Sequence, residues 1–361
     1  MSYESQAAAI DRALLEAIGT WHRNGLEWNE AQFAELARSV FAHQLQYNQP
    51  YARYCATFGV TIDSMPETYA GIPAVPTAAY KEATLTTFDP ARATLAFETS
   101  GTTQGAGGRH YMETSTVYDA SLLAAFDRFM LADGARLRYF NFVPNPADRP
   151  QSSLGYMMAR VSERRGDGKT GWFVRGDELF VDAFVAAADA AIRNDVPVCI
   201  AGTAFAFVQL CDQLAARNRS FTFPAGSRIM ETGGFKGRSR ILAREDLYAA
   251  LAIALGIPQH DIIAEYSMTE LSSQWYDDAA TRVKRSPPWL RALVVGANNE
   301  PVPDGIVGSI VHVDLANRSS CLAVLTEDLG AIVDGGLVLL GRERGAALRG
   351  CSLDAETLRT R

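Results

Sequence analysis

The stretch FETSGTTQGAGGRH, residues 97–110, has the most unusual composition in the chain and decides how the rest is interpreted. Four hydroxyl residues and four glycines fall within ten positions: Thr99, Ser100, Thr102 and Thr103, with Gly101, Gly105, Gly107 and Gly108. Glycine allows close main-chain approach and a positive φ, and hydroxyl and backbone N–H groups can donate hydrogen bonds to phosphate oxygens. From composition alone, an ordinary polar turn and a phosphate-binding loop are equally good interpretations.

Two well-known phosphate motifs are absent from the chain. GDGKT, residues 166–170, has the ending of the GxxxxGK[ST] motif, but Glu163 occupies the position of its first glycine. The pair Gly105 and Gly107 begins a GxGxxG pattern, but His110 stands at its sixth place. The loop must therefore be interpreted from the sequence around it.

The flanking sequence predicts alternating helices and strands. Apolar spacing predicts helices at 5–19, 30–47 and 114–134, and the prolines of residues 72–82 predict an extended segment. Further along, strands and helices alternate: strands at 138–143, 196–202, 227–234 and 261–267, and helices at 178–195, 204–218 and 244–256. This alternation indicates βαβ units and a mainly parallel sheet with helices on both faces. The last sixty or so residues are β-rich and predict a smaller antiparallel sheet or distorted barrel.

Composition narrows the class of protein. A chain of 361 residues has room for two or three domains of ~150 residues. The net charge of −7, without a long Lys/Arg run, argues against a nucleic-acid partner or a membrane surface. No apolar run reaches the ~20 residues of a membrane span, and the N-terminus lacks the apolar region of a signal peptide. Five widely spaced cysteines without metal-ligand spacing favour a reducing, cytoplasmic location.

Four motifs in order carry a resemblance to a known superfamily. ETSGTTQG (98–105) resembles the [ST]SGTTG phosphate loop of the adenylate-forming enzymes, which make acyl-AMP from a carboxylic acid and ATP. AEYSMTE (264–270) resembles their Y-G-M-T-E motif, TEDLG (326–330) their T-G-D-L-G motif, and GRERGAALRG (341–350) the GR…RG segment that follows. The order of the motifs makes a phosphate loop the better interpretation of residues 98–105.

Further segments resemble one branch, the acyl-protein synthetase family of LuxE-type enzymes. They are IPAVPTAAYK (72–81), NPADRPQSSLGYMM (145–158), ETGGFKGRSR (231–240) and RGCSL (349–353). The resemblance implies an α/β fold of the adenylate-forming large-domain type, with parallel sheets flanked by helices and a smaller β-rich C-terminal subdomain. It implies no mobile C-terminal lid domain. We expect a helical N-terminal part at 1–90, an α/β core at 91–290 and the β-rich subdomain at 291–361.

The resemblance also implies roles for residues in the nucleotide site. ATP phosphates would contact loop residues, namely Thr99, Ser100, Gly101, Thr102, Thr103 and Gly105. The adenosine would be held by residues of three other motifs: Tyr266 stacking on adenine with Ser267 beside it, Glu231, Gly233 and Gly234 shaping the adenine pocket, and Asp328 and Arg342 at the ribose. Thr269 would contact the α-phosphate and Glu270 would bind Mg²⁺. The loop departs from the family at Gln104, where glycine is usual.

Structural interpretations of the same residues remain open. YSMTE alone is more often a strand end with Thr269 as a helix N-cap. ETGG is explained equally well as a strand-terminating turn, and a lone Asp328 in a β-turn is usually structural. For Cys351, the family implies an acyl-thioester, with Arg344 and Arg349 close enough in sequence to lower the thiol pKa. The other four cysteines lie in apolar patterns and are expected to be packing residues.

The implied activity is ATP-dependent activation of a carboxylic acid, most readily a fatty acid, followed by acyl transfer to a cysteine thiol. ATP and Mg²⁺ are the implied cofactors, and an acyl-accepting reductase is the implied partner. One alternative is a ligase that transfers the acyl group to CoA, a carrier protein or an amine. Another is a nucleotide-binding scaffold without catalysis, which the glutamine at position 104 permits.

Overall fold

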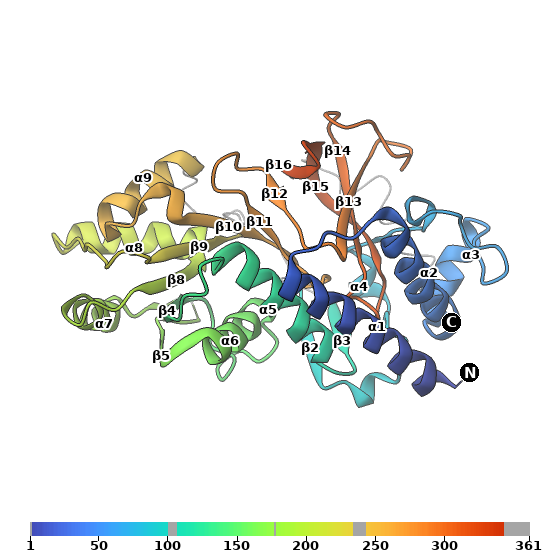
Figure 1. Ribbon diagram of the computed structural model, residues 1–361, viewed down its shortest axis with the longest axis horizontal. Helices are drawn as coiled ribbons and strands as arrows, with labels where there is room; N and C mark the ends of the chain where they lie inside the picture. The colour runs from blue at the N-terminus through green and yellow to red at the C-terminus, as the bar shows by residue number, and fades with distance from the viewer. Residues whose placement is uncertain (1, 100–106, 177, 234–242, 343–361) are drawn as a thin grey trace. The chain divides into compact units, whose positions relative to one another are not determined.

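The computed structural model describes residues 2–99, 107–176, 178–233 and 243–342 (Figure 1). The chain forms two compact units. The first comprises Met1–Ala125, Met268–Gln274 and Val283–Arg361, and the second comprises Phe126–Ser267 and Trp275–Arg282. The first unit is therefore built from three separate parts of the sequence.

The second unit is an α/β unit with a mainly parallel sheet of order β11-β10-β9-β8-β4-β5. Strands β10, β9, β8, β4 and β5 run parallel to one another, and β11 is antiparallel to β10. The strands are β4 (Leu137–Phe142), β5 (Gly166–Trp172), β6 (Val174–Arg175), β7 (Glu178–Leu179), β8 (Val198–Thr203), β9 (Arg228–Thr232), β10 (Ile262–Tyr266) and β11 (Trp275–Asp277). The helices are α6 (Ser153–Arg165), α7 (Val181–Arg193), α8 (Ala204–Ala216), α9 (Arg244–Leu255) and the short η3 (Gln259–Asp261).

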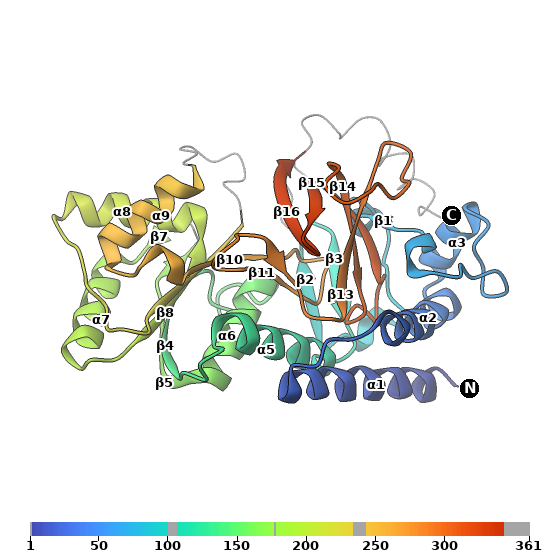
Figure 2. The same ribbon diagram turned by 45° about the horizontal axis from the view of Figure 1, so that its top comes forward.

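Alternating side chains of these strands bury both faces of the sheet. Phe140, Phe142 and Ile200 point into an apolar core with α7, α8 and α9, whose Phe184 is fully buried. The opposite face presents residues such as Tyr139, whose ring contacts Phe126 near the end of α5. Helices thus lie on both sides of the strands of this unit (Figure 2).

The first unit contains an antiparallel sheet of order β13-β14-β15-β16-β12, with the short β1 parallel to β15. The strands are β1 (Val75–Pro76), β2 (Leu95–Glu98), β3 (Arg109–Met112), β12 (Lys284–Arg285), β13 (Leu290–Val295), β14 (Gly308–Asp314), β15 (Ala323–Val333) and β16 (Gly336–Arg342). The helices are α1 (Tyr3–Asn24), α2 (Glu30–Tyr47), α3 (Gln49–Thr57), α4 (Ala79–Glu82), α5 (Thr116–Met130, which ends in the second unit), η1 (Tyr69–Gly71) and η2 (Pro90–Arg92). β13 to β16 stand side by side in Figure 2.

Local sequence signals explain the two long N-terminal helices. Ser2 caps α1, which ends at Gly25 with a left-handed φ of 65°. Asn29 and Gln32 form a reciprocal capping box at the start of α2. Apolar residues at helical spacing then bury one side of each helix.

The α/β fold class expected from the sequence is confirmed, and so are the helices and strands predicted on either side of the loop. One expectation was wrong in part: residues 79–82 form the helical turn α4 rather than continuing an extended segment. Pro73 and Pro76 lie before this turn, so neither blocks its hydrogen bonds. No pattern in the sequence indicated α3, α6 or β5.

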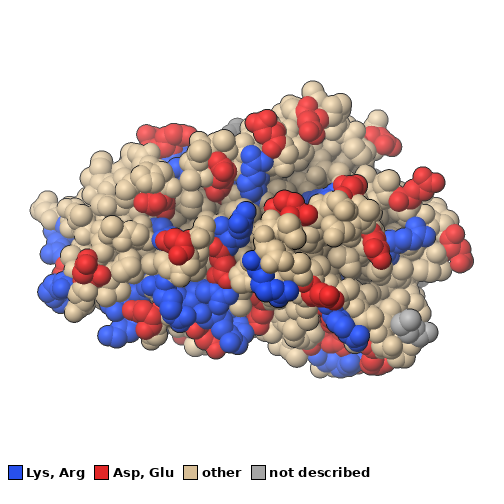
Figure 3. All heavy atoms as spheres, in the orientation of Figure 1, with Lys and Arg blue, Asp and Glu red and all other residues tan. Residues whose placement is uncertain are grey.

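Basic side chains gather on the part of the second unit that bears α6 and β5 (Figure 3). Acidic partners neutralise several of them, as in the ion pairs Arg138–Asp167 (2.8 Å) and Arg165–Asp127 (2.5 Å). Among the described helices, none is long and apolar enough to cross a membrane.

Candidate active site

The glycine-rich loop starts and ends on a hairpin of the first unit. β2 and β3 are antiparallel and pair Glu98 with Arg109, whose side chains form an exposed ion pair of 3.0 Å. Thr99 closes the hairpin, because its N–H donates to the Gly108 carbonyl (2.8 Å) and its Oγ1 accepts from the Gly108 N–H (3.0 Å). The Thr99 hydroxyl proton is still able to donate to a ligand.

The two glycines at the end of the loop are required by close backbone packing. A Cβ on Gly107 would lie 2.7 Å from the Thr99 carbonyl oxygen. A Cβ on Gly108 would lie 2.8 Å from the carbonyl carbon and oxygen of Tyr80. Side chains do not fit at these distances, so the loop base has one tight arrangement of three backbone segments.

Thr269 and Glu270 lie in a turn that the first unit holds through its main chain. The Thr269 carbonyl accepts from Nδ1 of His110 (2.8 Å), two residues beyond the loop base. Burial lowers the pKa of His110 to about 4, so the ring is neutral at pH 7 and a carbonyl partner requires the proton on Nδ1. Nδ2 of Asn317 donates to the Glu270 carbonyl (2.8 Å). The base of the glycine-rich loop and Glu270, the residue expected to bind Mg²⁺, are thus connected through one hydrogen-bonded segment.

The two residues expected at the ribose are partners of one another. Asp328 on β15 lies opposite Arg342 on β16, and Nε of Arg342 donates to Oδ1 of Asp328 (2.7 Å). Asp328 is mostly buried, whereas the Arg342 side chain is 63% exposed. A carboxylate that is fixed by one charged partner keeps acceptor capacity for a vicinal diol.

The residues expected at adenine lie in the second unit, at the carboxyl ends of β9 and β10. The two strands are parallel and pair Thr232 with Glu265, whose side chains are hydrogen-bonded. Glu231 is buried and accepts from the Tyr248 hydroxyl (3.4 Å). Tyr266 ends β10 and is only partly buried. Ligands of open parallel sheets bind at this edge, so the position suits a nucleotide base.

A positive φ of 70° at Gly233 turns the chain immediately after β9. Ser267 follows β10 and is also partly buried. Several expected ligands lie outside the described residues: Ser100, Gly101, Thr102, Thr103 and Gly105 of the loop, Gly234, and Cys351.

The four described cysteines are poor nucleophiles, which agrees with the expectation that they are packing residues. Burial raises the pKa of Cys55 and of Cys199 to about 12, and that of Cys211 to about 11. Burial also raises the pKa of Cys321 well above its usual value. None of these four thiols is therefore ionised to a useful extent near pH 7.

Sequence reasoning missed two side chains that hold the Glu270 turn, Asp314 and Asn317. Their signal is modest: HVDLANRSS, residues 312–320, places an acid and an amide directly after an apolar strand. Both side chains are buried. Buried polar side chains need hydrogen-bond partners, and Asp314 and Asn317 find theirs in the turn that carries Glu270.

Solved structures of other proteins share the fold of this chain. An open form of 2-hydroxyisobutyryl-CoA ligase with 2-HIB-AMP and CoA has a TM-score of 0.64 at 15% identity, covering 86% of this chain and 75% of that chain. McyG A-PCP with phenylalanyl-adenylate has a TM-score of 0.51 at 17% identity, covering 71% of this chain and 48% of that chain. This chain thus spans about half the length of the second structure. The fold is that of the adenylate-forming enzymes.

The family follows from the sequence match. The model of the acyl-protein synthetase family, LuxE, matches residues 22–358, so the chain belongs to this family. The long-chain-fatty-acid–luciferin-component ligase of Vibrio harveyi is 21% identical over 364 residues, covering 97% of this chain and 94% of that protein. The resemblance seen in the motifs is confirmed, and the chain is an AMP-forming ligase of the acid–thiol class.

Proposed function

We propose that this enzyme adenylates a long-chain fatty acid with Mg-ATP and passes the acyl group to a thiol, that of Cys351. One observation carries the nucleotide part: His110, just beyond the phosphate loop, binds the carbonyl of Thr269 in the segment that supplies Glu270. The Vibrio harveyi relative is a long-chain-fatty-acid–luciferin-component ligase, which supports a long-chain fatty acid as the substrate.

The chemistry has two steps, each with one bond formed and one broken. A carboxylate oxygen of the acid attacks the α-phosphorus of ATP, and the bond to the oxygen bridging to the β-phosphate breaks, which releases pyrophosphate. The thiolate sulfur then attacks the acyl carbon, and the carbon–oxygen bond to AMP breaks. Positioning of the reactants and stabilisation of the phosphate charge are the contributions that the protein makes to the first step.

The proposed nucleotide contacts divide among the motifs. Thr99 and the loop residues 100–105 bind the β- and γ-phosphates, and Thr269 binds the α-phosphate. Tyr266, Ser267, Glu231 and the glycines at 233 and 234 surround adenine. Asp328 and Arg342 bind the ribose. The contact between these last two residues supports the assignment, because the arginine already orients the carboxylate.

Glu270 is the proposed Mg²⁺ ligand. Within the described parts of the chain, no group of three His, Cys, Asp or Glu residues is placed to hold a metal ion. Magnesium suits such a site, because it is commonly bound by one or two carboxylates together with substrate phosphates and water. When bound, it neutralises charge on the phosphates.

Cys351 is proposed as the acyl acceptor, and the four described thiols support this choice by their raised pKa values. The test is intact mass after incubation with Mg-ATP and a panel of fatty, aromatic and amino acids. We expect an added acyl mass from a fatty acid, reversed by hydroxylamine, lost in Cys351→Ser and retained in the control Cys211→Ser. Pyrophosphate release without an adduct would contradict Cys351 and favour CoA, a carrier protein or an amine as acceptor. No pyrophosphate exchange with any acid would instead favour the scaffold.

The setting of the enzyme is proposed on similar grounds. Free thiols at Cys55, Cys199, Cys211 and Cys321 suit a reducing compartment, so we propose the cytoplasm. An acyl-protein thioester needs a consumer, and a reductase that accepts the acyl group is the proposed partner. The division of the chain into three parts with boundaries at residues 90 and 290 stays a prediction.

A further inference from the structure

The last residue of β14 and the turn after it make direct hydrogen bonds to the segment that carries Glu270. Both carboxylate oxygens of Asp314 accept from this segment: Oδ2 from the N–H of Ser272 (2.8 Å) and Oδ1 from the hydroxyl of Ser273 (2.7 Å). The Asn317 amide donates to the Glu270 carbonyl (2.8 Å) and accepts from the Ser272 hydroxyl (2.7 Å). Two side chains therefore fix four polar groups within Glu270 to Ser273.

From these contacts we propose that Asp314 and Asn317 are positioning residues, which hold Glu270 where it binds Mg-ATP. The inference rests on the proposed role of Glu270 as Mg²⁺ ligand. Neither side chain needs to touch the nucleotide. They act on the main chain of the ligand-bearing turn, in the way that outer-shell partners orient the ligands of a metal.

The donors and acceptors around Asp314 are ordered in one direction. The indole N–H of Trp289 donates to the hydroxyl of Ser121 (2.7 Å), which lies 3.0 Å from the hydroxyl of Ser273. The Ser273 hydroxyl uses its one proton on Asp314, so it accepts from the Ser121 hydroxyl. The backbone N–H of Ala316 gives Oδ1 of the same carboxylate another donor at 3.0 Å. A fully buried carboxylate with this many donors has one favourable orientation.

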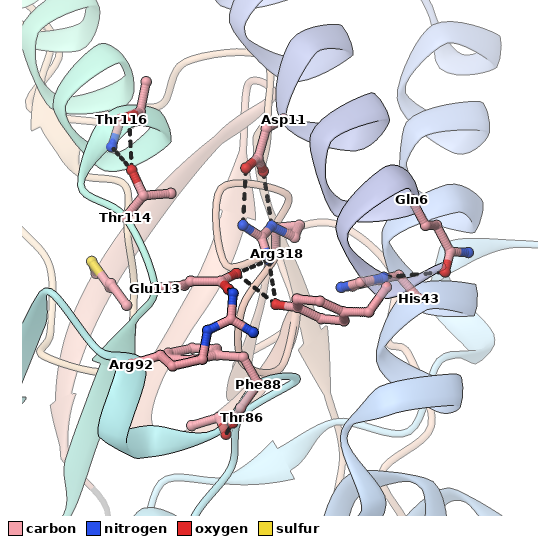
Figure 4. Close-up of polar contacts among 12 residues, drawn as sticks. Gln6, Asp11, His43, Thr86, Phe88, Arg92, Glu113, Thr114, Thr116 and Arg318 are labelled. Carbon is pink, nitrogen blue, oxygen red and sulfur yellow. Dashed lines mark hydrogen bonds and ion pairs between the residues drawn. The ribbon is translucent and has the colours of Figure 1, made fainter. Parts of the chain in front are cut away.

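The turn itself is anchored to the N-terminal helices. Gln44 of α2 donates to the carbonyl of Asn317 (2.8 Å), and its Oε1 accepts from the N–H of Leu322 (3.0 Å). Next to Asn317, the guanidinium of Arg318 binds both oxygens of Asp11 in α1 (2.8 and 2.9 Å). Figure 4 shows Arg318 between Asp11 and Glu113, which follows β3. The helices thus fix the turn, and the turn fixes the Glu270 segment.

A control variant in the same region can distinguish a positioning role of Asn317 from a general contribution to stability. Asn48 is a matched residue, since it is an equally buried asparagine whose amide donates to the Ser320 carbonyl (3.1 Å) of the same region. It has no hydrogen bond to the segment Glu270–Ser273 among those the described residues show. Asn48→Ala should lower the stability of the protein and leave the position of Glu270 unchanged. Asn317→Ala should lower the stability and also shift Glu270.

The experiment measures ATP–pyrophosphate exchange as a function of free Mg²⁺ with a long-chain fatty acid as the substrate. We expect Asn317→Ala to raise the half-saturating Mg²⁺ concentration about tenfold and to regain most of its maximal rate at high Mg²⁺. The half-saturating Mg²⁺ concentration of Asn48→Ala should stay within twofold of the wild-type value, although its melting temperature is comparable to that of Asn317→Ala. Ser272→Ala, which removes only the hydroxyl bonded to Asn317, should shift the Mg²⁺ dependence in the same direction by a smaller factor.

The outcomes separate this inference from the proposed function. If Glu270→Gln abolishes exchange but Asn317→Ala and Ser272→Ala both match Asn48→Ala, the positioning role is wrong and the function stands. If Asn317→Ala does not fold, the Ser272→Ala result alone decides. If the wild type shows no exchange, or Glu270→Gln exchanges normally, the role of Glu270 fails and this inference fails with it.

Discussion

The interiors of the two units are built from different kinds of contact. In the second unit, Phe140, Phe142 and Phe184 pack with the aliphatic residues of α7 to α9 around a parallel sheet. In the first unit, side chains such as Asp314 and Arg318 are buried and make several hydrogen bonds each. Apolar packing is non-directional and tolerates small shifts, but a buried polar group requires its partner at a set distance and angle. The first unit is therefore the one able to fix a ligand-bearing turn.

The largest difference in stability between the two units is expected at acidic pH. Burial lowers the pKa of His43, His110 and His312, all in the first unit, to about 4. The unfolded chain takes up these protons below pH 6.5 while the folded chain stays neutral, so the stability they contribute is present above pH 6.5 and lost toward pH 4. Burial raises the pKa of Asp314 to about 6, which opposes this loss.

Between pH 7.5 and pH 5, each of the three histidines should lower the free energy of unfolding of the first unit by about 2 kcal/mol, and Asp314 should raise it by about 1 kcal/mol. The net decrease is about 5 kcal/mol. Hydrogen exchange of peptides from each unit, corrected for the intrinsic rate, measures the difference. His43→Gln should reduce the loss by about 2 kcal/mol. Equal losses in both units would remove the contrast between them.

A cavity in the aromatic core should destabilise the second unit without affecting the site chemistry. The Phe184 ring is fully buried, with centroids 5.0 Å from Phe142 and 5.5 Å from Phe173. Phe184→Ala should lower the free energy of unfolding by about 4 kcal/mol in urea titration. Exposed Phe58 is the control, and its alanine variant should change stability by less than about 1 kcal/mol. A changed Mg²⁺ dependence in Phe184→Ala would show that the apolar core also positions the site.

Removing one partner from the buried ion network should destabilise the first unit slightly less. The Arg318 side chain is 3% exposed and faces Asp11 and Glu113. Arg318→Met leaves both carboxylates without this cation and should cost about 3 kcal/mol. The double variant Arg318→Met/Asp11→Leu should recover part of that loss, because it also removes the Asp11 carboxylate, whereas Glu113 keeps its ion pair with Arg92 (2.7 Å). No recovery in the double variant would mean that the arginine acts by packing alone.

The smallest effect is expected at the loop base. A Cβ on Gly107 would meet the Thr99 carbonyl oxygen at 2.7 Å, so Gly107→Ala must shift the hairpin at which the glycine-rich loop, the proposed phosphate loop, starts and ends. We expect the KM for ATP to rise about tenfold, equivalent to about 1.4 kcal/mol. Gly296→Ala is the matched control, since its Cβ would make an ordinary contact of 3.4 Å with Val302. A KM within twofold of the wild type in both variants would show that the loop base adapts.

The same contrast decides what the sequence could predict. The second unit was predictable because near-continuous apolar strands alternate with helices, a pattern that is local. Even there, β5 was missed, because GDGKTGW is an edge strand with hardly any apolar residues. The contacts of Asp314 and Asn317 were not predictable, since their partners Ser272 and Glu270 lie 42 and 47 positions away. Only the folded chain shows which distant polar groups meet.

The amide contacts of α2 also have a consequence for how the chain is made. Gln44 and Leu322 are 278 positions apart, and a ribosome adding about 5–20 residues per second takes roughly 14–56 s to cover that distance. Phe126–Ser267, the main part of the second unit, is synthesised well before that point. The helices made first are thus among the last elements to meet their partners. A nascent chain stalled before residue 314 would contain the whole sequence of the second unit, while Gln44 of α2 would still lack its partners Asn317 and Leu322.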